Sequence, residues 1–299
     1  RVAKALETLH HVDLAIIVFR GEWGSDEEKL LARIKAEGVD YIIVHNLFGS
    51  EKTGNYLESD LSTGERDRLM EAIKKALPEH SYKSYSMLGG RCATDDLVLL
   101  VCPIDSEAPS GRLILPQVQA IRDILDNNAM AVTLQPQQIP AFLALGVEPK
   151  VVVTDSQVID LVKKSLPESL YDRLTTFSIL LAELKGDVEE YKKGLKKAAS
   201  LKQGDKILIM ENCLHQTSCE DIGRVKIPRW LNEWLGCELD YTVVSGLSPL
   251  PENLEEYALV VQCGGCMVTP RQLKSRIRRV VLRGVSITNY GMLIKLIKG

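Results

Sequence analysis

Short, unbroken apolar runs alternate with charged, amphipathic segments along most of this chain. Such runs are typical of buried strands in a parallel sheet, because helices cover both faces of that kind of sheet. A strand, a helix and a second strand in this order also predict a βαβ unit. The sequence therefore predicts an α/β protein with mainly parallel sheets. The runs lie at 13–19, 39–44, 97–102, 130–134, 150–154, 206–210, 241–244 and 258–262.

The segments between these runs carry helix start and stop signals. Ser25 with Glu28 three residues later forms a capping-box pattern. Pro116 suits the first turn of a helix and Asn127 suits its end. Thr269 precedes Pro270 at the start of another helix. We expect helices at 25–37, 65–77, 115–127, 157–164 and 188–200, and two more that open after residues 226 and 269.

The chain length sets the number of domains. One hydrophobic core rarely grows beyond roughly 250–300 residues, and this chain has 299. A linker-like stretch without periodicity lies at 80–91, and a new strand–helix series opens near 174. We therefore predict three small units with boundaries at 1–82, 83–173 and 174–299.

Composition excludes several classes of protein. The net charge of −3 gives no reason to expect a nucleic-acid partner. No run of 18 apolar residues is present, so no membrane span is predicted. The seven cysteines accompany no secretion signal, which favours a reduced, cytoplasmic chain over a disulfide framework.

The sequence feature with the most chemistry is a set of cysteines that follow two of the predicted strands. Cys213 and His215 follow the run 206–210, and Cys263 and Cys266 follow the run 258–262. Ligands of parallel α/β sheets gather outside the carboxyl ends of the strands. The two glycines between Cys263 and Cys266 allow a tight turn, since glycine tolerates positive φ. These residues predict a metal or iron–sulfur site.

Two kinds of metal centre fit this pattern. Cys213, His215, Cys263 and Cys266 could hold a structural zinc ion as a Cys₃His site. A 4Fe–4S cluster normally takes four thiolates, so three motif cysteines would leave one iron to a weaker ligand. His215, Cys219 and Glu220 are candidates for that position, and we favour Glu220 for its longer tether. An oxygen ligand on such an iron is a poor match in softness, as an exchangeable position requires.

Two other groups have ordinary structural explanations. Cysteines beside apolar stretches are read as small buried hydrophobic residues; these are Cys92, Cys102 and Cys237. A run of arginines on the helix after residue 269 is read as a solvated helix face; these are Arg276, Arg278, Arg279 and Arg283.

The order C-x-H followed by C-G-G-C resembles the cluster motif of the FeFe-hydrogenase maturation GTPases, the HydF family. That family usually reads C-x-H…H-C-x-x-C. Gln262 stands at the position of the second histidine, which argues against an obligatory ligand there. Three further stretches also match the family, at 103–119, 152–158 and 220–230.

The resemblance implies an architecture. Residues 1–82 would be the C-terminal part of a P-loop GTPase domain, 83–173 a dimerisation domain and 174–299 an iron–sulfur cluster-binding domain. The chain is then expected to begin inside the GTPase domain, without the phosphate loop and switch motifs that GTP hydrolysis needs. Asn46, Leu47, Phe48 and Gly49 stand where the base-recognition motif N-K-x-D is expected, and Ser62–Thr63 stand where the S-A motif is expected.

The resemblance also implies a function. The chain would be a scaffold or carrier that holds a 4Fe–4S cluster on Cys213, Cys263 and Cys266, with a labile fourth ligand. It would receive a diiron precursor from radical-SAM maturases and transfer it to apo-FeFe-hydrogenase. GTP with Mg²⁺ would regulate the full-length family member. A homodimer or a higher oligomer in the cytoplasm is expected.

Overall fold

The computed structural model describes residues 8–9, 12–48, 56–59, 66–77, 86–104, 111–211 and 221–298. The chain divides into two compact units, Arg1–Ser84 and Tyr85–Gly299. Every strand pairing in the described ranges is parallel, which confirms the predicted α/β class with mainly parallel sheets. Across these ranges, no helix is long and apolar enough to span a membrane.

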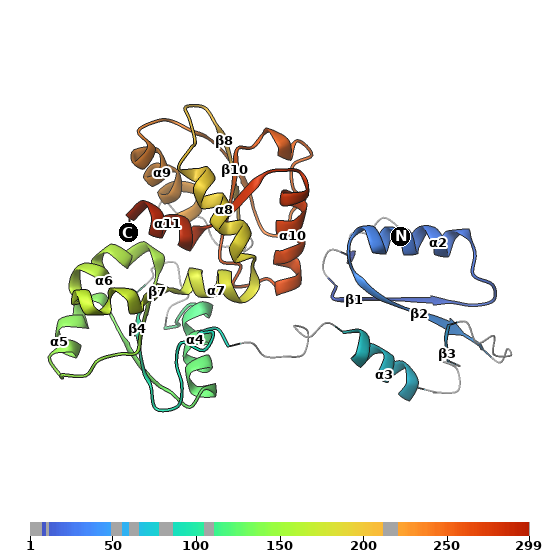
Figure 1. Cartoon of the computed structure of the whole chain (residues 1–299), viewed down its shortest axis with the longest axis horizontal. Helices are drawn as coiled ribbons and strands as arrows, with labels where there is room; N and C mark the ends of the chain where they lie inside the picture. The colour runs from blue at the N-terminus through green and yellow to red at the C-terminus, as the bar shows by residue number, and fades with distance from the viewer. Residues whose placement is uncertain are drawn as a thin grey trace. The chain divides into compact units, whose positions relative to one another are not determined.

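The described residues of the first unit form a three-stranded sheet in the order β1-β2-β3 and the helices α2 and α3 (Figure 1). Ile17, Leu31 and Ile34 form the centre of its core. The capping-box pattern places Ser25 at the N-cap of its helix, but the N-cap is Gly24 and Ser25 is the first helical residue. The elements are β1 (Leu14–Phe19), α2 (Ser25–Ala36), β2 (Asp40–Asn46), β3 (Leu57–Ser59) and α3 (Asp67–Ala76).

Asn46, the first residue of the degenerate base-recognition stretch, is the last residue of β2. Phe48 follows with a positive φ of 45° and is exposed. Gly49 and the pair Ser62–Thr63 lie outside the described residues.

The second unit contains two four-stranded parallel sheets. The first has the order β5-β4-β6-β7 and the second has the order β11-β10-β8-β9. The elements around the first sheet are β4 (Leu97–Val101), α4 (Leu115–Asp126), β5 (Met130–Leu134), α5 (Ile139–Leu143), β6 (Val151–Thr154), α6 (Ile159–Ser165), β7 (Leu174–Thr176) and α7 (Phe177–Lys185). Those around the second sheet are α8 (Val188–Ala198), β8 (Lys206–Met210), α9 (Ile227–Leu235), β9 (Asp240–Val244), β10 (Leu259–Gln262), α10 (Pro270–Leu282), β11 (Ser286–Asn289) and α11 (Tyr290–Lys298).

Strand β7 belongs to the first of these sheets, although we predicted that residue 174 opens the third unit. Leu174 pairs with Val152 of β6, and Thr176 pairs with Thr154. The Thr176 side chain also caps α7, because its hydroxyl accepts the Ile179 N–H at 3.2 Å. The start of α7 is therefore fixed to the first sheet. The domain boundaries themselves stay a prediction.

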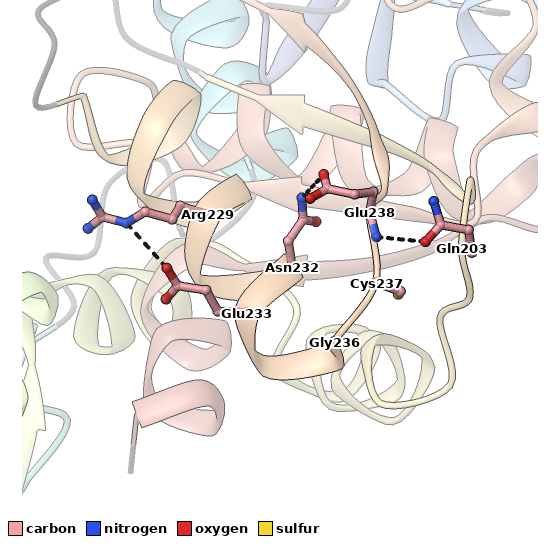
Figure 2. A pocket seen from close by; sticks show the side chains of 7 residues that line it. All are labelled: Gln203, Arg229, Asn232, Glu233, Gly236, Cys237 and Glu238. Atoms are coloured by element: carbon pink, nitrogen blue, oxygen red, sulfur yellow. Dashed lines mark hydrogen bonds and ion pairs between the residues drawn. The ribbon is translucent and has the colours of Figure 1, made fainter.

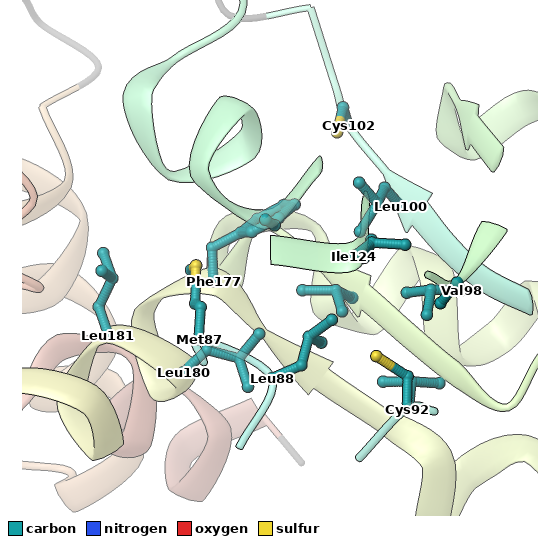
Figure 3. Packing of buried hydrophobic residues seen from close by; sticks show 14 residues of the cluster. Met87, Leu88, Cys92, Val98, Leu100, Cys102, Ile124, Phe177, Leu180 and Leu181 are labelled. Atoms are coloured by element: carbon teal, nitrogen blue, oxygen red, sulfur yellow. The ribbon is translucent and has the colours of Figure 1, made fainter. Parts of the chain in front are cut away.

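Helix α7 packs into the cores of both sheets. Phe177, Leu180 and Leu181 join the cluster that contains Val98 and Leu100 of β4 (Figure 3). Ala182 joins the cluster under the second sheet. The helix also packs against α10 and α11, which flank that sheet (Figure 1). It therefore connects the two sheets through buried apolar contacts.

Two of the cysteines with an ordinary explanation lie in the core that α7 shares with β4. Cys92 and Cys102 are both buried there (Figure 3). Burial raises the pKa of the Cys102 thiol to about 12, because the thiolate would lose its hydration. Both side chains act as small apolar residues in the described structure. Cys237 is half-buried elsewhere.

Substitution of Gly194 by alanine is expected to destabilise the second unit. An added Cβ would lie 2.0 Å from the Ile287 carbonyl oxygen, because α8 crosses β11 closely at this point. Such overpacking costs about 1–3 kcal/mol or more. Urea unfolding of Gly194→Ala should show this loss of free energy of unfolding. Lys196→Ala, at an exposed site on the same helix, is the control, and equal stability of the two variants would contradict the packing.

Candidate metal centre

The second sheet has a topological switch point between β8 and β10. The chain passes from β8 to β9 on one side of the sheet and then crosses to β10 on the other side. Ligand sites of open α/β sheets form at the carboxyl ends of strands at such a point. Met210 ends β8 opposite Gln262, which ends β10. The Cys263 N–H donates to the Met210 carbonyl at 3.0 Å. Cys263 therefore lies at the mouth of this crevice.

The turn from Cys263 to Cys266 is closely packed. Gly265 has a φ of +65°, and an added Cβ there would lie 2.9 Å from Leu273 and 3.0 Å from Val268. Glycine is required for both reasons, the backbone conformation and the space. Cys263 packs against the core that contains Tyr290, and Cys266 packs against the core that contains α7. Both cysteines are half-buried, so the turn presents two thiols where the two sheets meet.

A buried lysine contacts the backbone of this turn. Lys185, the last residue of α7, has only 7% of its surface exposed. Its Nζ donates to the carbonyl oxygens of Gly265 at 3.1 Å, Cys266 at 3.2 Å and Val268 at 3.1 Å. A buried ammonium group requires such partners, because its loss of hydration is costly. Sequence reasoning missed this residue, since one lysine at the end of an apolar helix forms no recognisable motif.

Gln262 points to the other face of the sheet. It is fully buried, and its Oε1 accepts the hydroxyl proton of Tyr191 at 3.3 Å. Cys263 instead packs with the residues on the opposite face, as the alternation of side chains along a strand requires. This arrangement favours the interpretation that position 262 is not a metal ligand in this chain.

Three predicted ligands, Cys213, His215 and Glu220, lie outside the described residues, and so does Cys219. The described residues at both ends of this segment converge on Arg224. The guanidinium Nη2 bonds to the Glu211 carboxylate at 2.9 Å. The Arg224 backbone N–H donates to the Asp221 carboxylate at 2.8 Å. Glu211 is thus bonded to the side chain of Arg224, and Asp221 is bonded to its backbone. Arg224 belongs to a π-helical turn, Ile222–Lys226. Such turns are frequent at functional sites.

Tyr290 and Arg276 are buried side chains with polar groups that flank this region. The Tyr290 hydroxyl has no hydrogen-bond partner among the described residues. Burial raises the pKa of Tyr290 well above its usual value, and the neighbouring Cys263 adds to this effect.

Arg276 corrects the interpretation of the arginine run as a wholly solvated face, because only 7% of it is exposed. Its Nε donates to the Met210 sulfur at 3.2 Å and its Nη1 to the Ser248 carbonyl at 3.0 Å. Burial, followed by the charge of Arg279, lowers the pKa of Arg276 to about 10. A buried cation thus lies beside the last residue of β8. Helical spacing could have singled it out, because Leu273, Ile277 and Val280 on the same helix are also buried.

In the part of the chain that the structure describes, no group of three or more His, Cys, Asp or Glu side chains could hold a metal ion. Only Cys263 and Cys266 of the five predicted ligands fall in that part. Any complete ligand set of three or more such side chains within this chain therefore needs residues outside the described part of the chain.

The pocket in Figure 2 lies elsewhere and has a volume of about 430 Å³. Gln203 precedes β8 and Glu238 precedes β9, so the pocket is at the amino edge of the sheet, opposite the cysteine turn. Its lining includes Cys237 but no other cysteine. It is therefore separate from the candidate metal centre.

The fold and the crevice define a class: an α/β protein in which two parallel sheets share one helix and a cysteine turn lies at a switch point. Comparison with protein families then gives two matches. Residues 87–186 match the hydrogen maturase F dimerization domain. Residues 189–299 match the hydrogen maturase F tetramerization domain. The comparison with curated proteins gave no match.

The chain belongs to the hydrogen maturase F (HydF) family, a family of hydrogenase maturation. This confirms the family that the cysteine spacing and the three further stretches predicted. The matched domains are both domains of self-association, which supports the expected homo-oligomer. The boundary between the two matches falls after α7, at 186–189.

The two tyrosines near the turn are expected to respond differently to removal of their hydroxyl groups. Tyr191→Phe should lower the free energy of unfolding by about 1–3 kcal/mol, because the buried Gln262 oxygen loses its donor. Tyr290→Phe should be neutral or stabilising by about 1 kcal/mol, since its hydroxyl is buried without a partner in the described structure. Urea unfolding of the metal-free proteins measures both. The reverse order would contradict the assigned hydrogen bonds.

Proposed function

We propose that this chain binds a 4Fe–4S cluster through Cys213, Cys263 and Cys266 and serves as a scaffold or carrier in FeFe-hydrogenase maturation. The observation that carries the proposal is the location of Cys263 and Cys266 at the switch point between β8 and β10. The family membership supports the same role.

Chain length brings the third cysteine within reach of the same point. Cys213 follows Met210 by three residues, and three extended residues span at most roughly 11 Å. Met210 itself is bonded to the Cys263 N–H. The third thiolate can therefore meet the other two at the crevice without any change in the described strands.

The described residues fit an iron–sulfur centre. Iron–sulfur clusters are held by cysteine thiolates, and burial and hydrogen bonding around the sulfurs set their potentials. Cys263 and Cys266 are half-buried beside apolar cores, with the turn backbone close to both. Such surroundings limit solvent access but leave an open side for exchange.

The fourth ligand in this proposal is Glu220, with His215 as its competitor. Glu220 directly precedes Asp221, which is bonded to Arg224. Arg224 is in turn paired with Glu211, on the other side of the segment. These contacts hold the end of the segment near its start. A carboxylate on a thiolate-ligated iron is a poor match in softness, and so it is displaceable by a ligand from an incoming diiron unit.

Exchange at that iron is the step that a carrier needs. The chain would take a diiron precursor from radical-SAM maturases and pass it to apo-FeFe-hydrogenase. The homo-oligomer provides the scaffold for this transfer. GTP with Mg²⁺ would act on the partner exchange in family members that carry the phosphate-loop and switch motifs.

Loss of one predicted cysteine ligand is expected to abolish or grossly alter cluster binding. Iron and sulfide content after anaerobic reconstitution should fall well below wild type in Cys213→Ser, Cys263→Ser and Cys266→Ser. Cys237→Ser, at the opposite edge of the sheet, is the matched control. Wild-type iron content in the three variants would refute the assignment. A colourless wild-type protein with one zinc would establish the structural zinc site instead.

The identity of the fourth ligand is tested by spectroscopy. Glu220→Ala should retain a cluster on three cysteines but change the EPR signal of the reduced cluster and its response to imidazole, because the displaceable carboxylate is gone. Glu233→Ala, at an exposed glutamate on α9, should leave both unchanged. If Glu220→Ala matches wild type and His215→Ala does not, the fourth ligand is His215.

A further inference from the structure

Lys185 lies outside the cysteine motif but hydrogen-bonds directly to the backbone of the turn. Its Nζ donates hydrogen bonds to three carbonyl oxygens within four residues, from Gly265 to Val268. An ammonium group has three N–H donors, which can serve three such carbonyl groups. We propose that Lys185 is a positioning residue that fixes the Cys263–Cys266 turn and thereby sets the retention and the reduction potential of the bound cluster. The inference rests on the proposed function.

The contacts fix more than the carbonyl groups. Each peptide unit is planar and trans, so its N–H points away from its C=O. Lys185 draws the carbonyls of Gly265 and Cys266 to its own side. The N–H groups of Cys266 and Met267 must then face the other side of the backbone. Hydrogen bonds to cluster sulfurs are one of the factors that set cluster potential, so the orientation of these amides bears on the centre directly.

The positive charge of Lys185 also affects the reduction potential of the cluster. One-electron reduction adds a negative charge to a cluster, and a nearby cation stabilises that charge. The effect is larger in a buried, low-dielectric location than in water. Lys185 has 7% of its surface exposed, and it contacts the backbone of Cys266. Removal of this charge should therefore make the cluster harder to reduce.

Lys185 also joins two regions of the chain. It lies at the end of α7, within the match to the dimerization domain, whereas the turn lies in the match to the tetramerization domain. The two elements are closely packed: a Cβ added at Gly264 would lie 3.4 Å from Leu181 and 3.5 Å from Ser178, both on α7. The turn thus packs on a helix that also contributes to the core of the first sheet.

The first test uses metal-free protein, so it does not depend on the proposed function. Lys185→Met keeps the length of the side chain but removes its charge and its donors. Amide hydrogen exchange at 264–269 should become faster by roughly tenfold or more, since even one charge-assisted hydrogen bond corresponds to about that factor. Lys192→Met, at an exposed lysine of α8 paired with Glu189, is the control. Unchanged exchange in Lys185→Met would overturn the positioning role.

The second test uses the reconstituted cluster. Lys185→Met should release iron to a chelator roughly 10–100-fold faster, as loss of a supporting contact around a metal typically does. Its midpoint potential should be more negative and its EPR signal altered, and Lys185→Arg should recover part of both by restoring charge. Lys192→Met should match wild type. If Lys185→Met fails to fold, Lys185→Gln carries both tests with the same criteria.

The outcomes separate the two proposals. Wild-type protein that takes up no iron and sulfide refutes the proposed function, whatever the exchange data show. Wild-type protein with a cluster, together with Lys185→Met of unchanged retention, potential and EPR signal, refutes the role of Lys185 alone.

Discussion

Burial of α7 against two cores is the constraint on which the second unit depends. Phe177, Leu180 and Leu181 belong to the core under the first sheet, and Ala182 belongs to the core under the second. A helix with a wide apolar surface is stable only when that surface is covered. Neither sheet alone covers α7. The two sheets therefore stabilise each other through this helix, and the cysteine turn lies at the end of it.

Much of the fold could be predicted from local patterns. Runs such as 97–102 and 206–210 became the central strands β4 and β8, because a strand covered on both faces needs no polar positions. Strand β11 was missed, since Ser286–Asn289 contains a single aliphatic residue. Its pairing with β10 and its contact with α8 place it in the sheet. Such tertiary contacts outweigh local propensity and leave no signal in a short segment.

The candidate site was predictable only in part, for a related reason. Cysteine spacing after two strands located the turn, since the fold brings the carboxyl ends of parallel strands together. Lys185 lies 78 residues before Cys263 in the sequence, and no spacing rule connects them. Arg276 was predicted to lie on a solvated helix face with the other arginines of its helix, although it is buried. Both residues are cations whose burial depends on tertiary packing, which the sequence alone does not display.

Two buried cations near one cysteine turn limit what the crevice can bind. Lys185 contacts the turn, and Arg276 contacts the Met210 sulfur. The carbonyl of Met210 accepts the hydrogen bond from the Cys263 N–H. Burying positive charge is unfavourable unless negative charge or oriented dipoles compensate it. Carbonyl oxygens compensate Lys185, whereas one Nη2 donor of Arg276 has no partner among the described residues. A thiolate-ligated cluster is anionic and would supply the remaining compensation. The proposed anionic cluster would therefore pair with the Arg276 donor that the described residues leave without a partner.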